Sequence, residues 1–212
     1  MKKPFPGINK LLEIQNQALR EPAEVICGSY ISNGIVPESL EYNTAGDFLS
    51  ILEKLNVTLL ITREYEHLVI ALNVKNNKLR QSFIHLPHPS GITVDRKTNK
   101  VYVAATRNPN QLVELAIASN PTSKLPEKVL TPARVKYYGG AHYFHDLAFI
   151  NGGLYANSVG KNSILKVDFN STKTDKVVWS PLEAKENTRN HIQLNSIAAG
   201  KSLVDSYFSA SA

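Results

Sequence analysis

The amino-acid sequence predicts an all-β fold: a partial β-propeller of about three four-stranded blades and the start of another, with a short N-terminal helix. Three observations predict this fold: a loop segment that repeats without gaps, an apolar strand that recurs ahead of each repeat, and turn residues that separate short strands. The expected domains are a helical extension over residues 1–24 and an incomplete propeller over 25–212. The blades are expected at approximately 44–86, 88–138, 143–181 and 192–212.

The N-terminal segment predicts one helix and one strand. Ile8, Leu11, Leu12 and Leu19 stand among Glu and Gln residues, which is typical of an amphipathic helix over 8–19. Residues 25–31 form an apolar run that predicts an extra strand, and this strand could close the ring with the other terminus.

The repeated loop segment is eight residues long and occurs three times, at spacings of 44 and 52 residues. Its copies are 62–69, 106–113 and 158–165. Each copy follows one β-type run and leads into another, so each predicts a loop between two strands. Four short strands per unit at these periods are typical of propeller blades.

A small or polar residue followed by an apolar strand opens each unit. This slot is filled by residues 46–49, 90–94, 145–149 and 195–199. Turns follow at Thr98-Asn99 and Asn151-Gly152-Gly153, and a last strand is expected in each unit, at 79–86, 128–138 and 175–180. No crossover helix is indicated between the strands, which argues against a parallel α/β sheet.

Residues 47–55 allow two interpretations. Phe48, Ile51, Leu52 and Leu55 fit one face of a short helix. The place of this segment in the repeat favours a strand instead, and we expect a strand here.

The fourth blade is expected to contain only its inner strands. After the strand at 195–199, residues 202–212 predict a second strand, and there the sequence stops. An open ring leaves sheet edges exposed. Either the parent protein is longer, or a partner chain completes the ring, in which case the open edges would allow self-association.

Composition narrows the classes of protein to consider. Hydrophobic residues make up 42% of the chain, enough for a core, and no apolar run is long enough for a membrane helix or a secretory signal. The single cysteine, Cys27, cannot form an internal disulfide and is expected to be a small buried residue, which fits a reducing cytoplasm. The net charge of +6 is concentrated in turns between residues 73 and 107, where solvated lysines and arginines are usual. We therefore expect a cytoplasmic protein that binds neither nucleic acid nor membrane.

Four short motifs carry a resemblance to a known family. They are His88-Pro89-Ser90-Gly91-Ile92, Thr106-Arg107-Asn108-Pro109, His142-Tyr143-Phe144-His145-Asp146-Leu147-Ala148-Phe149 and His191-Ile192-Gln193-Leu194-Asn195-Ser196-Ile197-Ala198. Together they resemble an uncharacterised bacterial β-propeller family, a conserved domain of unknown function, over roughly residues 45–212. Gln193 and Ser196 stand where that family has His and Gly. The family's members tend to be longer, which implies a truncated chain, and residues 92–103 are also similar to Tyr-Val-Thr-Asn and NHL-type propeller repeats.

Candidate site residues follow from the expected topology. In an up-and-down blade, the loop before the innermost strand and the loop between the second and third strands lie on one face. Arginines in these loops could hold a carboxylate or phosphate, and the expected ligand-binding residues are Arg63, Arg107, His88, His145, Asp146 and Asn195. Neutral imidazoles could hold a divalent metal, zinc or calcium, and the expected metal ligands are His88, His142, His145 and His191.

Structural roles are equally open for these residues. The histidines could bond neighbouring backbone, and Asp146 and Asn195 could cap the inner strands. Arg63 and Arg107 could pair with Glu64 or Glu66. The sequence indicates no catalytic residue. We expect a module that binds a small molecule, peptide or glycan on this face. The alternatives are a metal-dependent lyase or hydrolase, similar to propeller lyases with histidine-bound zinc, and a protein-interaction scaffold.

Overall fold

The computed structural model describes residues 37–107, 110–119, 128–173, 175–181, 190 and 192–211. The predicted helix at 8–19, the predicted strand at 25–31, Cys27 and His191 lie outside these residues. The described residues divide into two compact units at Pro89 and Ser90, and each unit is described by itself.

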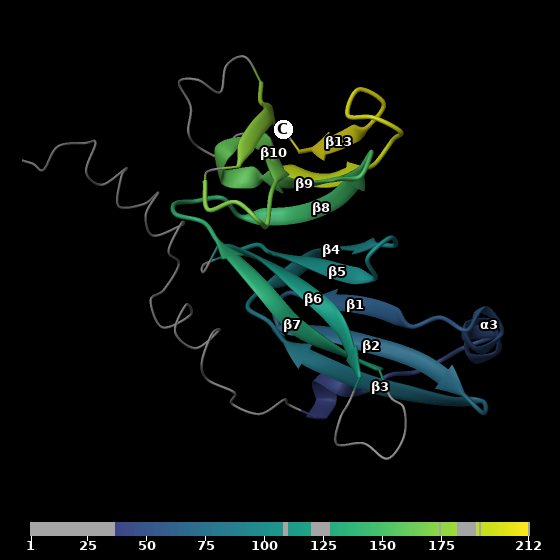
Figure 1. The fold of residues 1–212 in the computed structure, drawn as a ribbon. Helices are drawn as coiled ribbons and strands as arrows, with labels where there is room; N and C mark the ends of the chain where they lie inside the picture. The colour runs from purple at the N-terminus through teal and green to yellow at the C-terminus, as the bar shows by residue number, and fades with distance from the viewer. Residues whose placement is uncertain are drawn as a thin grey trace, which may run out of the picture. The chain divides into compact units, whose positions relative to one another are not determined.

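The unit that ends at Pro89 contains one three-stranded antiparallel sheet (Figure 1). Its elements are the 3-10 helix η1 (Pro37–Leu40), the helix α3 (Phe48–Leu55), and the strands β1 (Leu59–Arg63), β2 (Leu68–Lys75) and β3 (Lys78–His85). Asn76 and Asn77 join β2 to β3 with φ of 53° and 55°, the left-handed conformation that a tight hairpin turn needs. Leu68, Ile70 and Leu72 of β2 form its core, with Leu40 and Leu79 packed against them.

The expected strand at 47–55 is wrong, because this segment is the helix α3. Leu52 is buried on its apolar side, and Asn56 ends the helix in the left-handed conformation. The Glu53 carboxylate accepts a hydrogen bond from the Asn77 backbone N–H, at 3.2 Å, which ties the helix to the β2–β3 turn. The 3.6-residue apolar period therefore decided the local structure, and the place in the repeat did not.

The second unit contains two four-stranded antiparallel sheets and one two-stranded sheet among its described residues (Figure 1). The first sheet has the order β4-β5-β6-β7, the second β8-β9-β10-β11, and the third pairs β12 with β13. The strands are β4 (Pro89–Asp95), β5 (Lys100–Ala105), β6 (Gln111–Ser119), β7 (Lys128–Tyr137), β8 (Phe144–Ile150), β9 (Gly153–Ser158), β10 (Ser163–Val167), β11 (Lys176–Trp179), β12 (Leu194–Ala198) and β13 (Tyr207–Ala210).

Each four-stranded sheet is made of consecutive strands joined by short connections, as in a propeller blade. This order confirms the predicted all-β class and two of the predicted four-stranded units; the first predicted unit has three strands, because its opening segment is the helix α3. The repeated segments do form the connections between strands: Arg63 ends β1, Thr106 follows β5, and the 3-10 helix η2 (Val159–Lys161) follows β9. The described residues show no closed ring.

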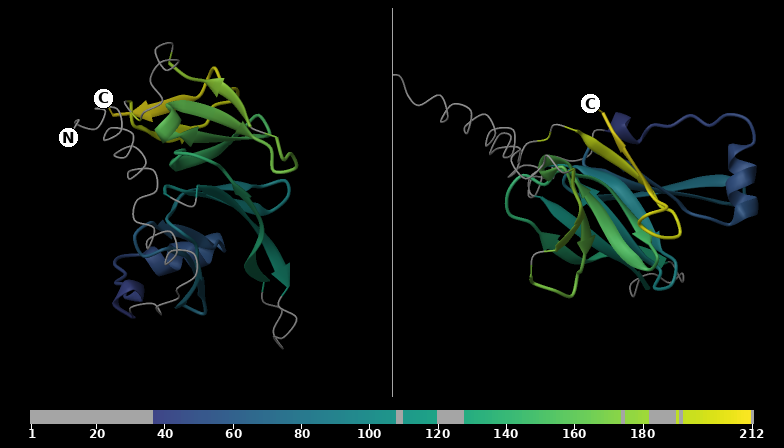
Figure 2. Two further views of the ribbon diagram at one scale, coloured as in Figure 1. Left: turned by 90° about the vertical axis from the view of Figure 1, so that its left-hand side faces the viewer. Right: turned by 90° about the horizontal axis from the view of Figure 1, so that it is seen from above.

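Neighbouring sheets of the second unit pack face to face. Tyr102 and Ala104 of β5 lie in one core cluster with Leu147 of β8 and Leu165 of β10, which joins the two four-stranded sheets. On the other face of the second sheet, Ala148 and Ile150 pack with Ile197 of β12, and β12 and β13 lie along this face (Figure 2).

Gly91 allows the inner strands β4 and β8 to approach closely. A Cβ atom at this position would lie 2.4 Å from the Cα atom of Asp146, closer than any side chain permits. Any larger residue at position 91 would therefore push the two inner strands apart.

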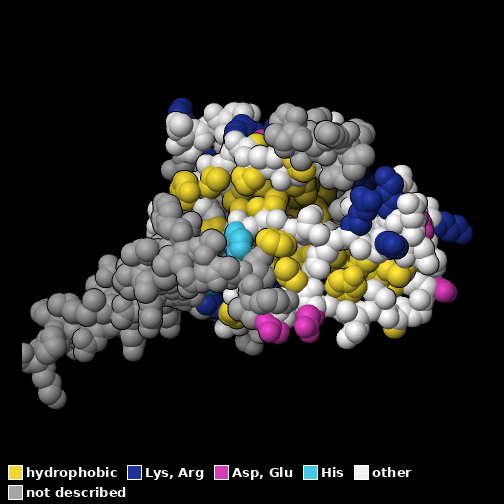
Figure 3. Space-filling view, turned by 90° about the horizontal axis from the view of Figure 1, so that it is seen from below, with side chains coloured by type: hydrophobic (Ala, Val, Ile, Leu, Met, Phe, Trp, Pro, Cys, Tyr) yellow, Lys and Arg dark blue, Asp and Glu magenta, His cyan; other side chains and the backbone are white. Residues whose placement is uncertain are grey.

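Charged side chains lie at the surface in groups. Lys75, Lys78, Arg96 and Lys97 are exposed in the hairpin turns, as the sequence predicts. Figure 3 shows one face on which Lys and Arg side chains gather beside hydrophobic ones. No helix within the described residues has the length and apolar character needed to cross a membrane.

Candidate functional site

In the first unit, Arg63 and His88 belong to the same end of the sheet. Arg63 is paired in register with Leu68, and Leu68 with His85, so the end of β1, the start of β2 and the end of β3 lie together. Arg63 forms an ion pair with Glu66 at 2.5 Å, one of the two structural partners considered from the sequence. His88 is buried; its backbone N–H donates to Nδ1 of His67 at 3.1 Å, and the two rings meet edge to face.

A buried asparagine joins the loop that carries Arg107 to the loop that carries His142. Oδ1 of Asn110 accepts the backbone N–H groups of His142 and Tyr143, at 3.2 and 2.9 Å, and its amide nitrogen donates to the carbonyl of Gly140. The loop after β5 therefore lies against the loop before β8. Arg107 is half-buried on the first of these loops.

This contact recurs at the other two repeats. Asn162 stands at the same repeat position as Asn110, and its Oδ1 accepts the N–H of Ile192 at 3.3 Å. In the first unit His67, one position later in the repeat, accepts the N–H of His88. Each repeat thus holds the loop that leads into the next inner strand, and we call Asn110, Asn162 and His67 the loop clamps.

Asp146 and Asn195 come together near the start of the inner strands β8 and β12, and His145 precedes Asp146 on β8. The Asp146 carboxylate accepts the N–H groups of Leu147 and Ile197, both at 2.8 Å, so it bridges the two strands. Asn157 is buried, accepts the N–H of Asp146 and donates to the carbonyl of Asn195 at 2.7 Å. Burial raises the pKa of Asp146, although the two N–H bonds partly offset this effect. These bonds agree with the capping role considered for Asp146.

His142 lies in an aromatic and largely apolar setting. Its ring stacks on that of Phe144, with the ring centroids 5.2 Å apart, and the ring of Tyr138 packs beside it. Its Nδ1 lies 2.8 Å from Oγ of the buried Ser158. Burial, and then the positive charge of Lys161, lower its pKa to about 4. His142 is therefore neutral at physiological pH.

A cavity of about 540 Å³ opens beside His142, between β7 and the strands β10 and β11. Its wall is apolar at Leu165 and Val177, aromatic at Tyr138, and positively charged at Lys161 and Lys173, which are both exposed. Hydroxyl groups also line it, from Ser163, Thr172 and Ser180.

A buried carboxylate fixes one wall of this cavity. The Asp175 carboxylate accepts hydrogen bonds from Nζ of Lys136 at 2.6 Å, from the hydroxyl of Tyr138 at 2.5 Å and from the backbone N–H of Asp168 at 3.0 Å. Lys136 also donates to the carbonyl groups of Asp168 and Ser171. Burial, and then the bond to Asp175, raise the pKa of Tyr138 well above its ordinary range. These bonds attach the 168–175 loop to β7.

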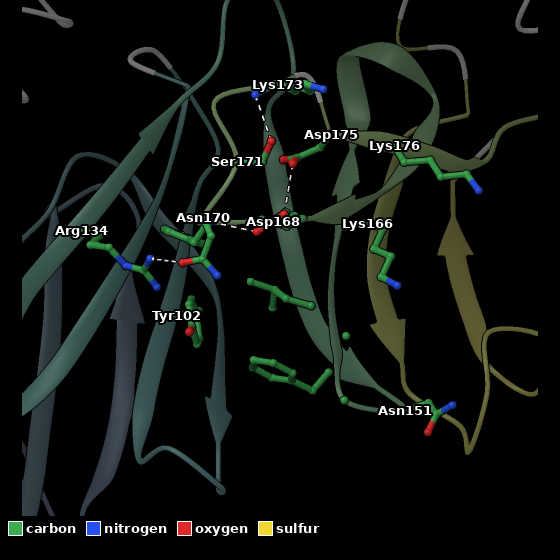
Figure 4. A pocket seen from close by; sticks show the side chains of 16 residues that line it. Tyr102, Arg134, Asn151, Lys166, Asp168, Asn170, Ser171, Lys173, Asp175 and Lys176 are labelled. Atoms are coloured by element: carbon green, nitrogen blue, oxygen red, sulfur yellow. Dashed lines mark hydrogen bonds between the residues drawn. The ribbon is translucent and has the colours of Figure 1, made fainter.

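A second cavity, of about 670 Å³, shares Lys173 and Asp175 of the 168–175 loop with the first (Figure 4). Three aromatic rings line it: Tyr102, Phe149 and Phe169, with ring centroids 5.5 Å (Tyr102–Phe149) and 5.3 Å (Tyr102–Phe169) apart. Arg134 enters from β7 and donates to Oδ1 of Asn170 at 2.8 Å. None of the candidate ligand-binding or metal-binding residues predicted from the sequence lines this cavity.

Arg134 is held in place by the buried Glu114. The Glu114 carboxylate accepts hydrogen bonds from Nε and Nη2 of Arg134, from Nζ of Lys100 and from the hydroxyl of Tyr102. Burial alone would raise the pKa of this carboxyl, but the hydrogen bonds from Arg134, Lys100 and Tyr102 outweigh it and lower the pKa to about 2. Burial, and then the bond to Glu114, raise the pKa of Tyr102 to about 12.

The predicted metal site is only partly covered by the described residues, because His191 lies outside them. Among them, no three His, Cys, Asp or Glu side chains are grouped so that they could hold a metal ion. His142 uses Nδ1 toward Ser158, and His191 lies outside the described part of the chain.

The histidines and arginines chosen from the sequence therefore have different surroundings. His142 lines a cavity, His88 and Arg63 bond within their own unit, and His145, Asp146 and Asn195 lie at the inner strands. Sequence reasoning missed Asn110, Arg134 and Asp175. For Asn110 a signal existed, because an asparagine stands at the fifth position of two of the three repeats.

Comparison with known proteins places the chain in a family. A family described as "Domain of unknown function (DUF4915)" matches residues 46–212. No curated protein matches the chain. Among solved structures, selenomethionine-substituted virginiamycin B lyase from Staphylococcus aureus is similar, with 14% sequence identity and a TM-score of 0.46 over 73% of this chain and 45% of that one. The chain thus spans less than half the length of that structure. On the match over residues 46–212, this chain belongs to the DUF4915 family.

Proposed function

We propose that this chain is a ligand-binding module, and that the cavity beside His142 binds a small hydroxylated acid, such as a uronic acid unit of a glycan. The observation that supports this proposal is the combination of two exposed ammonium groups, Lys161 and Lys173, with an apolar and aromatic wall in a single cavity. Pockets of this composition are typical of small-molecule sites, in which a few polar groups fix the orientation of the ligand.

The charges favour an acidic ligand. Among the described residues that line the wall, Asp175 is the one carboxylate, and it is already paired with Lys136. Lys161 and Lys173 therefore keep their positive charge available to a carboxylate. His142 adds no charge at neutral pH, because its pKa is about 4.

The remaining groups favour a hydroxylated ligand. Ser163, Thr172 and Ser180 offer hydroxyl groups that both donate and accept hydrogen bonds. The ring of Tyr138 and the side chains of Leu165 and Val177 offer an apolar surface for the C–H face of a sugar. The loop clamps hold the Arg107 loop next to the His142 loop, so a longer glycan could also reach Arg107. Ligand roles for Arg63, Arg107, His88, His145, Asp146 and Asn195 stay predictions.

Titration with glucuronic acid oligosaccharides, followed by isothermal calorimetry, tests the proposal. We expect saturable binding that neutral glucose oligosaccharides do not reproduce. Lys161→Gln and Lys173→Gln should each weaken binding about tenfold, the usual effect of removing one charge-assisted hydrogen bond.

Lys201→Gln is the matched control, because Lys201 is exposed and lies outside the cavity. It makes the same charge change and should leave binding unaltered. Equal binding of acidic and neutral oligosaccharides, or equal losses in all three variants, would contradict the proposal.

A further inference from the structure

The second cavity, between Arg134 and the three aromatic rings, carries a further site. We propose that it binds an anionic group attached to a flat ring: the anion on Arg134 and Asn170, the ring against Tyr102, Phe149 and Phe169. This site is independent of the proposed function, since it shares only Lys173 and Asp175 with the cavity beside His142.

Arg134 is already positioned for an anion. A guanidinium has five N–H donors. Two of them bind the Glu114 carboxylate and one binds Oδ1 of Asn170, while 38% of the side chain stays exposed to a ligand. Because Glu114 and Phe169 fix the guanidinium, a ligand would not have to order a flexible side chain.

The ion-pair cluster that holds Arg134 has a net positive charge. Glu114 is the single carboxylate of a cluster that contains two cations, Lys100 and Arg134. Its low pKa of about 2 keeps it charged, so the cluster as a whole holds one excess positive charge. Arg134 is the member of this cluster that lines the cavity, and 38% of its side chain is exposed.

Asn170 adds a neutral donor at the same place. Its Oδ1 accepts from Arg134, which directs its amide N–H₂ group away from the guanidinium and leaves it available to a ligand (Figure 4). Its own backbone N–H bonds to Asp168, so the position of the residue is fixed.

Lysines add positive charge to the cavity wall. Lys166 and Lys176 face each other across β10 and β11, and both are exposed. Like charges directly opposite each other on a sheet are unfavourable, and a bound anion would relieve this repulsion.

The three aromatic rings of the cavity favour a flat ring as the other half of the ligand. Tyr102 is buried and held by Glu114, and it meets Phe149 edge to face at 5.5 Å and Phe169 at 5.3 Å. A flat ring can pack on such a surface in the offset or edge-to-face geometries that aromatic pairs prefer. An inorganic anion would leave this surface unused.

Phenyl phosphate is the probe, with inorganic phosphate and phenol as its two halves. Saturation-transfer NMR and calorimetry on the whole chain should show that phenyl phosphate binds at least about tenfold more tightly than either half. Asn170→Asp should weaken this binding at least about tenfold, since it places a carboxylate next to the anion while keeping an acceptor for Arg134.

Asn99→Asp is the matched control, because Asn99 is exposed in a turn outside both cavities. It should leave phenyl phosphate binding unaltered. Phe169→Leu tests the ring independently and should remove the advantage of phenyl phosphate over inorganic phosphate.

Three outcomes would overturn the proposal: no saturable binding of phenyl phosphate, inorganic phosphate binding as tightly as phenyl phosphate, or equal losses in Asn170→Asp and Asn99→Asp. Binding of uronic acids, and its loss in Lys161→Gln, is measured separately, so failure of one site leaves the result for the other intact.

Discussion

Glu114 shows how one residue can organise a sheet. It lies on β6, directly opposite Tyr102 on β5 and Arg134 on β7, and all three side chains bond to one another through its carboxylate. A buried carboxylate is costly unless it is paired and hydrogen-bonded. Here four donor atoms satisfy it, so the strands β5, β6 and β7 are joined by side chains as well as by backbone.

Replacing Glu114 by Gln should lower the free energy of unfolding at neutral pH by roughly 2–3 kcal/mol, because Arg134, Lys100 and Tyr102 lose a charged acceptor. The folded state lowers the pKa of Glu114 from 4.5 to about 2. The unfolded chain therefore binds this proton more tightly. The stabilisation is complete above pH 4.5 and is lost as the pH falls toward 2.

Urea denaturation of both proteins between neutral pH and about pH 3 measures this effect. The difference between the two proteins should shrink below pH 4.5. Glu41→Gln, at an exposed position, should show no such difference at any pH. A difference for Glu114→Gln that stays constant down to pH 3 would contradict the assignment of a charged, paired carboxylate.

At the residue scale, the sequence indicates candidate residues that have distinctive chemistry. It does not indicate side-chain contacts that depend on the register between two strands. Histidines and arginines could be singled out from their type alone, yet of those within the described part of the chain only His142 lines one of the two cavities. Arg134 could not be singled out, because nothing in the chain order places it opposite Glu114. That pairing depends on the β6–β7 register, which contains a bulge between Glu114 and Leu115.

Among the helices and strands, too, some were predictable from the sequence and others were not. Strands bounded by turn residues were predicted correctly: the turn at Asn151 and Gly152 has φ of 48° and 75°, as a tight hairpin needs. The helix α3 is the exception: its position in the repeat predicts a strand, whereas the apolar period of Phe48, Ile51, Leu52 and Leu55 predicts the helix that forms. A repeat indicates where an element lies more reliably than what kind of element it is.

The loop clamps are the connection between one element and the next. Replacing Asn110 by Ala should lower the free energy of unfolding by roughly 2–3 kcal/mol, since two backbone N–H groups and one carbonyl lose their partner in a buried place. Chemical denaturation gives this value. Asn195→Ala, which removes an exposed side chain from β12, is the control and should change stability by less than about 0.5 kcal/mol.

If Asn110→Ala is no more destabilising than Asn195→Ala, the clamp does not contribute to stability. Asn110→Asp provides a second test of the contact. It keeps the acceptor for His142 and Tyr143 but sets an oxygen against the Gly140 carbonyl, so it should also be destabilising.

In the second unit, the protection of backbone N–H groups against hydrogen exchange should differ from strand to strand. β5, β6, β9 and β10 are paired on both sides, whereas β11 and β13 are paired on one side only among the described residues. Backbone N–H groups that are paired and buried open less often. Hydrogen exchange followed by mass spectrometry should show β9 and β10 exchanging at least about a hundredfold more slowly than β11 and β13. Equal protection of β9 and β11 would show that another segment covers β11.

At this scale, the class of fold was predictable and the location of the cavities was not. Strand count, strand order and antiparallel pairing follow from short connections, which the turn residues reveal. The cavities depend on how the 168–175 loop attaches to β7 through Lys136 and Asp175, two residues that are 39 positions apart. No local pattern in the sequence encodes such a contact.

The order of the strands also has a consequence for how the chain folds. In both four-stranded sheets every strand pairs with its immediate predecessor in the sequence, so β-pairing needs only short loops to close. Low contact order of this kind favours fast folding. As the ribosome delivers the chain, we expect the β4–β7 sheet to form before β8–β11 has been synthesised. The clamp at Asn110 would then be ready to receive His142 and Tyr143 as they emerge.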